Sequence, residues 1–225
     1  MTFQNQTSSS TLFISLNEQI SECRLCPRLV AWRESVAVEK RKSFSEEIYW
    51  GRGVPIFGDP EAERLIVGLA PAAHGANRTG RMFTGDRSGD WLYRALHTAG
   101  VASQPTSVRV GDGLTLKGAM ICATAHCAPP DNKPTPEEIG NCSRYLTALL
   151  ESRRWKAVLC LGGIAWGQVH KRMGEKLTPF GHGKSHCAAN GTLIVASYHP
   201  SQQNTFTGRL TEAMLDEAVS RWLED

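Results

Sequence analysis

The stretch LIVGLAPAAHGANRTGRMFTGD, residues 65–86, starts with an apolar run typical of a buried strand and continues as a long loop rich in glycine and alanine. Three further apolar runs with many β-branched residues follow along the chain. Helical patterns lie between the runs, and this alternation predicts an α/β fold in which a parallel sheet is covered by helices on both faces. The four predicted strands are residues 65–69, 119–123, 157–161 and 192–197.

The predicted helices are amphipathic, and one of them has a clear start signal. Thr135 and Pro136 precede acidic residues, which is the arrangement expected where a helix begins. In folds of this kind the loops at the carboxyl ends of the strands converge. The loops after the first, second and fourth strands are therefore the candidates for a functional site. Helices are predicted within residues 90–100, 135–154, 162–174 and 210–225.

The composition is typical of a soluble globular domain, with 41% hydrophobic and 21% charged residues and no apolar run long enough to span a bilayer. We expect a flexible tail at residues 1–12 and a single domain at residues 13–225. The polar N-terminal residues do not resemble a secretory signal. The formal net charge of +3 permits DNA as a partner without demanding it. An odd number of cysteines, seven, favours a reducing compartment, and we expect a cytoplasmic protein.

Four cysteines are candidates for one metal site. Cys23 and Cys26 are separated by two residues, a spacing that lets both thiolates reach a common metal or cluster. Cys127 follows the second strand and Cys142 lies on the next helix, so both can return to one strand end. Cys26 precedes a proline, which is closer to iron-sulfur usage than to zinc ribbons. The spacing alone leaves open that Cys127 and Cys142 are ordinary buried thiols.

Other cysteines and charges have simpler interpretations. Cys122 and Cys160 lie inside apolar strand runs and are expected in the core, whereas Cys187 lies in a loop and is assigned no role. The lysines and arginines within residues 28–42 are interpreted either as a solvated helix face or as contacts to a DNA backbone.

These motifs together resemble the uracil-DNA glycosylase superfamily, closest to its family 5, or type B. The similarity runs through CRLCPRLVAWRE, YWGRGVPIFGDPEA, GLAPAAHGANRTGRMFTGD, CAPPDNKPTPEE and SYHPSQQNTFTGRLT, over nearly the whole chain. It implies a three-layer α/β/α fold around a central four-stranded parallel sheet. It also implies a glycosylase that removes uracil and other deaminated bases from double-stranded DNA in base-excision repair, and we expect a monomer. The resemblance further implies a [4Fe-4S] cluster on Cys23, Cys26, Cys127 and Cys142.

A glycosylase must take the damaged base out of the stack and hold it in a pocket. Phe83 offers an aromatic face for that base, and Ala72 and Ala73 leave room for its ring. His199, directly after the fourth strand, is placed to donate a hydrogen bond to the base carbonyl, where negative charge develops as the bond breaks. From the residues alone, Phe83 is also interpretable as a core anchor and His199 as a strand cap.

The residue that assists the attacking water is less directly indicated. Related families carry a polar or acidic residue after the first glycine of the opening loop, where this chain has Leu69, an absence that family 5 shares. Asp86 could stabilise positive charge on the sugar or position the water, as carboxylates do in glycoside hydrolysis. It could equally cap the helix that follows. Asn132, after the second strand, is the other candidate for orienting the water.

Single residues in the loops are candidates for substrate selection and for contacts with DNA. Ala123 stands where family 4 enzymes carry an asparagine that reads the edge of uracil. A looser pocket is therefore expected, which accepts hypoxanthine, with xanthine and ethenocytosine as further candidates. Ser201 and Arg209 are candidates for phosphate contacts. The residues expected near the gap left by the flipped base are Gln202, Gln203 and Asn204.

Two other functions fit parts of the sequence. One is an iron-sulfur protein that binds DNA lesions without cutting, which the absence of an acid at Leu69 would suit. The other is a zinc protein that handles free nucleotides through the same four cysteines. Base release separates the glycosylase from the first, and stoichiometric iron separates it from the second.

Overall fold

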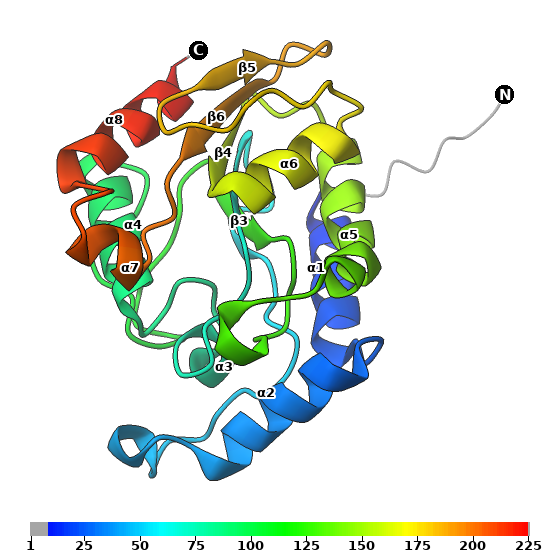
Figure 1. Cartoon of the computed structure of the whole chain (residues 1–225), viewed down its shortest axis with the longest axis vertical. Helices are drawn as coiled ribbons and strands as arrows, with labels where there is room; N and C mark the ends of the chain where they lie inside the picture. The colour runs from blue at the N-terminus through cyan, green and yellow to red at the C-terminus, as the bar shows by residue number, and fades with distance from the viewer. Residues whose placement is uncertain (1–8, 225) are drawn as a thin grey trace, which may run out of the picture.

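The structure, a computed structural model, describes residues 9–224 and is built around one sheet of six strands in the order β1-β3-β2-β4-β6-β5 (Figure 1). The four central strands are parallel. This confirms the predicted four-stranded parallel sheet, with bounds that differ from the predicted ones by no more than one residue. The central strands are β2 (Arg64–Gly68), β3 (Ala119–Ala123), β4 (Ala157–Leu161) and β6 (Leu193–Ser197).

Two short antiparallel strands extend the sheet at its edges. β1 (Phe57–Gly58) pairs with β3, and β5 (Ser185–Cys187) pairs with β6. Neither was predicted, because two or three residues are too few to show the alternation that marks a strand. Cys187, expected in a loop, is exposed on this edge strand.

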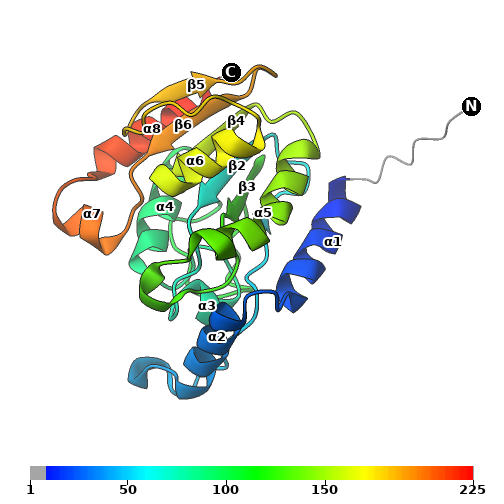
Figure 2. The ribbon, with the colours of Figure 1, turned by 45° about the vertical axis from the view of Figure 1, so that its right-hand side comes forward.

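Helices cover both faces of the sheet, as Figures 1 and 2 show. Because side chains alternate along a strand, Leu65 and Val67 of β2 face one core and Ile66 faces the other. The helices α4 (Arg87–Thr98) and α8 (Glu212–Leu223) pack on the Ile66 side. The opposite side is covered by α1 (Ser9–Glu22), α5 (Pro136–Glu151) and α6 (Gly163–Arg172). The predicted three-layer α/β/α fold is therefore confirmed.

The start of α1 corrects the expected extent of the N-terminal tail. Residues 9–12 belong to the first turn of this helix, and residues 1–8 lie outside the described residues. Leu12, Leu16 and Ile20 of α1 pack into the core beside β2, which explains why a stretch with a polar beginning is helical. The helix α5 starts where Thr135 and Pro136 predicted, and Thr135 and Glu138 form a capping box there.

Three short or peripheral helices belong to the loops that position the site. They are α2 (Pro27–Glu39), α3 (Ala76–Thr79) after β2, and α7 (Gln202–Phe206) after β6. A 3-10 turn, η1, spans Lys42–Phe44, and a second, η2 (Pro130–Asn132), follows β3. Within residues 9–224, no helix has the length and apolar character that crossing a bilayer requires.

Candidate functional site

The loop after β2 folds back so that Phe83 covers the end of its own strand. A Cβ atom on Gly68 would lie 2.9 Å from the Phe83 ring, so glycine is what allows this approach. Phe83 itself has a φ of +52°, a left-handed conformation that is unfavourable for an aromatic residue. Strained backbone of this kind persists where the surrounding structure imposes it, often at ligand sites.

His199, directly after β6, meets Phe83 at this place. The two ring centroids are 5.8 Å apart and the planes are inclined by 30°. The backbone of His199 is fixed by Asn204, whose side-chain amide donates to the His199 carbonyl at 2.8 Å. Burial lowers the pKa of His199 to about 4, so the ring is neutral at pH 7 and keeps one N–H to donate. The structure thus brings together the two residues predicted to grip a base.

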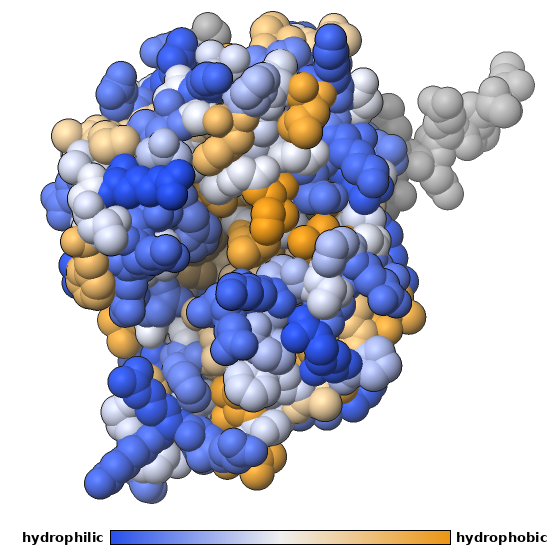
Figure 3. Space-filling model, viewed as in Figure 1, coloured by the Kyte–Doolittle hydropathy of each residue, from blue (hydrophilic) through white to orange (hydrophobic). Residues whose placement is uncertain are grey.

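The surface is hollowed near the middle of the face shown in Figure 3, with apolar side chains on one side of the hollow and hydrophilic ones around it. Ala123 is buried at the end of β3 and pairs in register with Gly68. Its methyl group offers no hydrogen bond. Ala72 and Ala73 are partly exposed after β2, and the Ala72 carbonyl accepts from the backbone N–H of Asn77 at 3.0 Å.

Asp86 is the N-cap of α4, which confirms the capping interpretation. Its Oδ1 accepts a hydrogen bond from the backbone N–H of Gly89 at 3.0 Å. Oδ2 lies beside Gly75, where a Cβ would come within 2.1 Å of it, so glycine is needed at that position. Burial raises the pKa of the Asp86 carboxyl. One oxygen is used by the helix, and the catalytic assignment stays a prediction.

Asn132 lies on the η2 turn and is exposed. Asp131 and Asn132 both have positive φ, 54° and 56°, so two consecutive residues are held in the left-handed region. In the described part of the chain no hydrogen bond or ring contact joins Asn132 to Phe83, Asp86 or His199. Its role with the water stays a prediction.

The segment after His199 presents the residues expected to meet DNA. Ser201 caps α7 by accepting from the N–H of Asn204, whereas Gln202 and Gln203 are exposed. The exposed Arg209 places its guanidinium 4.6 Å from the centroid of the Tyr198 ring. Sequence reasoning missed Phe206, which is 68% exposed and lies 4.7 Å from the guanidinium of Arg87. Its position as an aromatic residue within a polar loop was the available signal.

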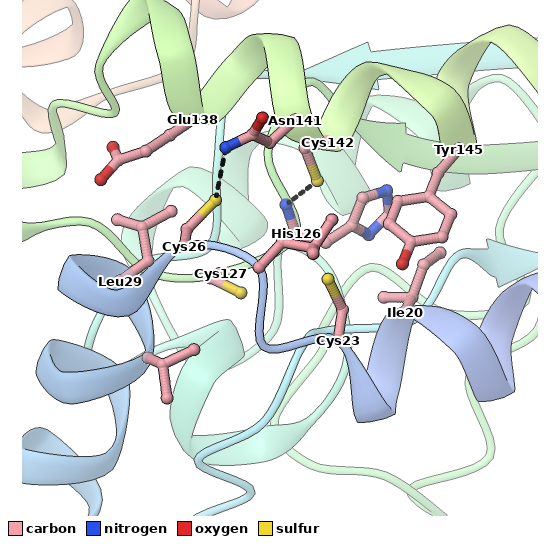
Figure 4. Close-up of a pocket in the computed structure, with 12 residues that line it drawn as sticks. Ile20, Cys23, Cys26, Leu29, His126, Cys127, Glu138, Asn141, Cys142 and Tyr145 are labelled. Atoms are coloured by element: carbon pink, nitrogen blue, oxygen red, sulfur yellow. Dashed lines mark hydrogen bonds between the residues drawn. The ribbon is translucent and has the colours of Figure 1, made fainter.

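The four candidate cysteines face a common space in Figure 4, where α2, α5 and the segment after β3 meet. Cys23 follows α1, and Cys26 is the residue before the first turn of α2. Cys127 follows β3 and Cys142 lies on α5. Segments more than a hundred residues apart in sequence therefore supply one sulfur-lined site. As predicted, Cys122 and Cys160 are instead buried in the core.

Each of these four sulfur atoms accepts one hydrogen bond. Two come from the backbone N–H of His126 to Cys142 at 3.3 Å and from the Asn141 amide to Cys26 at 3.6 Å. The other two come from arginines: Arg33 to Cys127 at 2.8 Å and Arg144 to Cys23 at 3.5 Å. Such donors favour thiolate over thiol, although burial raises the pKa of Cys26, Cys127 and Cys142.

The donor set indicates which metals the site suits. Four thiol groups share the site with apolar side chains and with His126, Glu138, Asn141 and Tyr145. Soft thiolates select zinc, copper(I) or iron-sulfur clusters over hard cations. Among residues 9–224, no three His, Cys, Asp or Glu side chains are grouped as a single bound ion would require. In a [4Fe-4S] cluster each cysteine binds a different iron, so its ligands need not converge on one point. The cysteines therefore fit such a cluster.

Comparison with known proteins defines the class to which this fold and site belong. A family model described as "Uracil DNA glycosylase superfamily" matches residues 55–223. The match takes in all six strands and the loops that carry Phe83, Asp86 and His199. The chain belongs to the uracil-DNA glycosylase superfamily.

Within that superfamily, three relatives that match most of this chain are named Type-5 uracil-DNA glycosylase. The protein of this name from Mycobacterium tuberculosis is 54% identical over 207 residues, which cover 90% of this chain and 77% of the relative. The one from Thermus thermophilus is 50% identical over 208 residues, 90% of this chain and 93% of the relative. The one from Pyrobaculum aerophilum is 46% identical over 207 residues, 92% and 90% respectively. The resemblance to family 5 is confirmed.

Proposed function

We propose that this protein is a monomeric DNA glycosylase that removes uracil and other deaminated bases from duplex DNA and leaves an abasic site. The observation that carries the proposal is the ring contact between Phe83, which lies against Gly68, and His199, at the carboxyl ends of the strands in a chain of this superfamily. The glycosidic bond is inaccessible inside a duplex, so the nucleotide must leave the stack before it can be cut. Phe83 then offers the face on which the extruded base stacks.

His199 stabilises the leaving base in this mechanism. As the bond to the sugar breaks, electrons move onto the base and its carbonyl oxygen becomes negative. The neutral His199 ring donates a hydrogen bond to that oxygen, and a donor aimed at a developing oxyanion contributes roughly 3 to 4 kcal/mol by analogy with acyl transfer. Because the pKa of His199 is low, the ring is not protonated at neutral pH and acts as a dipolar donor.

Asp86 faces the cationic side of the same step. The sugar gains positive charge as the base departs, and a buried carboxylate beside it lowers the energy of that charge or holds the attacking water. The Asp86 carboxylate, whose Oδ1 accepts from the Gly89 N–H, is the group proposed for this task. Asn132, with its strained backbone, is the alternative residue for orienting the water. No lysine is assigned to strand cleavage, so the product is an intact abasic strand.

Broad base selection follows from Ala123. A polar side chain at the end of β3 would reject bases that leave its buried hydrogen-bonding groups unpaired, and a methyl group imposes no such penalty. We therefore expect hypoxanthine to be removed as well as uracil, with xanthine and ethenocytosine as further candidates. Ser201, Gln202, Gln203, Asn204 and Arg209 are proposed to follow the DNA backbone and the gap beside the flipped base.

We propose a [4Fe-4S] cluster on Cys23, Cys26, Cys127 and Cys142. The support is a set of four sulfur atoms with an N–H donor to each, which suits thiolates that carry the charge of a cluster. When bound, the cluster supplies a cross-link between distant segments and no chemistry of base removal. Its cysteines tie the α1–α2 junction to α5 and to the segment after β3.

The test uses purified protein whose iron content has been measured. Duplexes that carry one uracil or one hypoxanthine are incubated with the enzyme, and abasic sites are revealed as alkali-dependent strand breaks. An identical duplex without a damaged base is the control. Breaks at both lesions support the proposal, and breaks at uracil alone contradict the broad pocket. If the iron-containing protein binds the lesion duplex but produces no breaks, the iron-sulfur lesion-binding protein is favoured. If the purified protein contains zinc in place of iron, the zinc protein that handles free nucleotides is favoured.

A further inference from the structure

Arg33, in the middle of α2, is a buried cation that forms no salt bridge with a carboxylate of residues 9–224. Its side chain is 1% exposed, and Nε has no hydrogen-bond partner. Nη1 donates to Cys127 Sγ at 2.8 Å and Nη2 donates to the Cys23 carbonyl at 3.0 Å. A buried charge is costly unless an opposite charge compensates it. In the described chain, the cysteine site is the only candidate that Arg33 contacts.

Two further arginines, Arg78 and Arg81, are also buried, and unlike Arg33 each forms a salt bridge. Arg78 pairs with Glu47, and Arg81 forms a bidentate pair with Asp112 at 2.7 and 2.9 Å. Both follow the rule that a buried guanidinium is matched by a carboxylate. Glu34 interacts with Arg33 electrostatically, but it is exposed and paired with Arg24. Thiolates of a negatively charged cluster would supply the matching charge in direct contact with the Arg33 guanidinium.

Arg144 provides an internal contrast at the same site. Its Nη2 lies 3.5 Å from Cys23 Sγ and 2.5 Å from the Tyr145 hydroxyl, but the side chain is exposed. Water screens its charge, whereas the charge of Arg33 acts across a dry interior. Two arginines donate to cysteines of one site, and only the buried one should govern the properties of a bound cluster.

The backbone of Arg33 leads from the cysteine site to the base pocket. Its carbonyl accepts from Nδ2 of Asn77 at 3.2 Å, and Asn77 is fully buried on α3. The Asn77 backbone N–H donates to the Ala72 carbonyl at 3.0 Å, within the loop that opens toward the pocket. The backbone carbonyl of Asn77 accepts from the backbone N–H of Gly51 at 3.0 Å. The position of α2 beside the cysteine site therefore helps to fix the position of the loop after β2, which opens toward the base pocket.

We propose that Arg33 is a positioning residue that supplies the counter-charge of the cluster at Cys127 and, through Asn77, holds the base-pocket loop in register with the cysteine site. This inference rests on the proposed function, since it requires both the cluster and the pocket. It assigns to one helix residue a link between a metal site and a binding site that are formed by different loops.

The first test compares Arg33→Met, Arg33→Lys and the matched control Arg144→Met. Iron per chain, visible absorption, the rate of iron loss to a chelator and the reduction potential are measured on each. Arg33→Met should lose iron about tenfold faster, since removing an outer partner of a metal ligand typically costs roughly 10–100-fold in metal affinity or activity. Its potential should shift to more negative values, because a nearby cation favours the added electron. Arg33→Lys should fall between Arg33→Met and wild type, and Arg144→Met should stay within about twofold of wild type.

Wild-type iron retention and potential in both Arg33 variants would overturn the proposal. If Arg33→Met does not fold, Arg33→Gln decides, because glutamine removes the charge and keeps a side-chain N–H donor. Iron loss faster than wild type supports the proposal, and the wild-type rate overturns it. A wild-type protein without iron or without uracil release is a different result, since it rejects the proposed function before any variant is made.

The link to the pocket is tested with Asn77→Ala, and Asn190→Ala in the turn before β6 is the control. Asn77→Ala should keep its iron and visible spectrum but excise uracil several-fold more slowly in single turnovers. The double variant Arg33→Lys/Asn77→Ala should lose less than the sum of the two single losses, as expected for residues in one network. Wild-type excision by Asn77→Ala, or additive losses, would show that Arg33 serves the cluster alone and would overturn the link.

Discussion

The cysteine site and the base pocket lie in the same layer of loops but are built on different principles. The cysteine site joins distant segments through sulfur atoms, and its neighbours are charges and N–H donors such as Arg33. The pocket is shaped mainly by what is missing, a Cβ at Gly68 and at Gly75, and by strained backbone at Phe83. We therefore expect loss of a cysteine ligand to lower the free energy of unfolding, whereas changes in the pocket should lower the rate of base removal.

Removal of one cysteine ligand is the change expected to have the largest effect. Cys142→Ala should lose the iron and lower the free energy of unfolding by about 3 kcal/mol or more, because a bound metal contributes its binding free energy to folding. The matched control is Cys160→Ala in β4, which removes a buried core thiol and should cost only about 1 kcal/mol. Denaturant unfolding with parallel iron assays checks both values. Equal losses in the two variants, with iron retained, would remove the distinction between the two sites.

Variants of Asp86 test the expectation that changes in the base pocket lower the rate of base removal. Asp86→Asn and Asp86→Ala separate its charge from its role as the α4 cap. Asparagine caps a helix about as well as aspartate does, so Asp86→Asn should keep the α4 cap and the stability while losing the charge. Its single-turnover excision should fall by about 100-fold, at the lower end of the range for a lost catalytic group. Asp86→Ala should add a stability loss of about 1 kcal/mol.

DNA binding separates the two roles of Asp86. Fluorescence anisotropy with a uracil duplex should give similar affinities for wild type and Asp86→Asn, because the lost charge acts on the transition state. Wild-type excision by Asp86→Asn would reduce Asp86 to a helix cap and transfer attention to Asn132.

Local patterns in the sequence predicted much of the fold. The predictions of the central strands, of the helix start at Thr135 and of the buried Cys122 and Cys160 all depend on neighbours in sequence, and each was confirmed. The edge strands β1 and β5 were missed because they are held by pairing with distant strands and carry no pattern of their own.

The residues of the two sites also differ in whether the sequence revealed them. Spacing and resemblance singled out the cysteines, Phe83 and His199. Arg33 lies in a stretch interpreted as a solvated or DNA-facing helix face, and its burial contradicts both interpretations for that residue. The cause is its contact with Cys127, 94 positions along the chain, and no local pattern reveals such a partner.

The smallest expected effect is a change in the free energy of unfolding with pH that depends on the protonation of His199. It tests whether a residue of the pocket also contributes to stability. The pKa of His199 is lowered to about 4 in the folded protein, below the value of about 6.5 of an unfolded chain. Between these values the unfolded chain binds a proton that the folded protein does not, so stability rises with pH through this window and falls on acidification. His199→Gln has no such proton.

The free energy of unfolding of wild type minus that of His199→Gln should therefore decrease from pH 7 to pH 5. We expect a change of about 1 kcal/mol, less than a fully buried histidine would give because His199 is partly exposed. Denaturant titrations at both pH values measure it, and subtraction cancels the groups that the two proteins share. Parallel stability curves would mean that His199 titrates normally, and the neutral donor proposed for the leaving base would then lose its electrostatic basis.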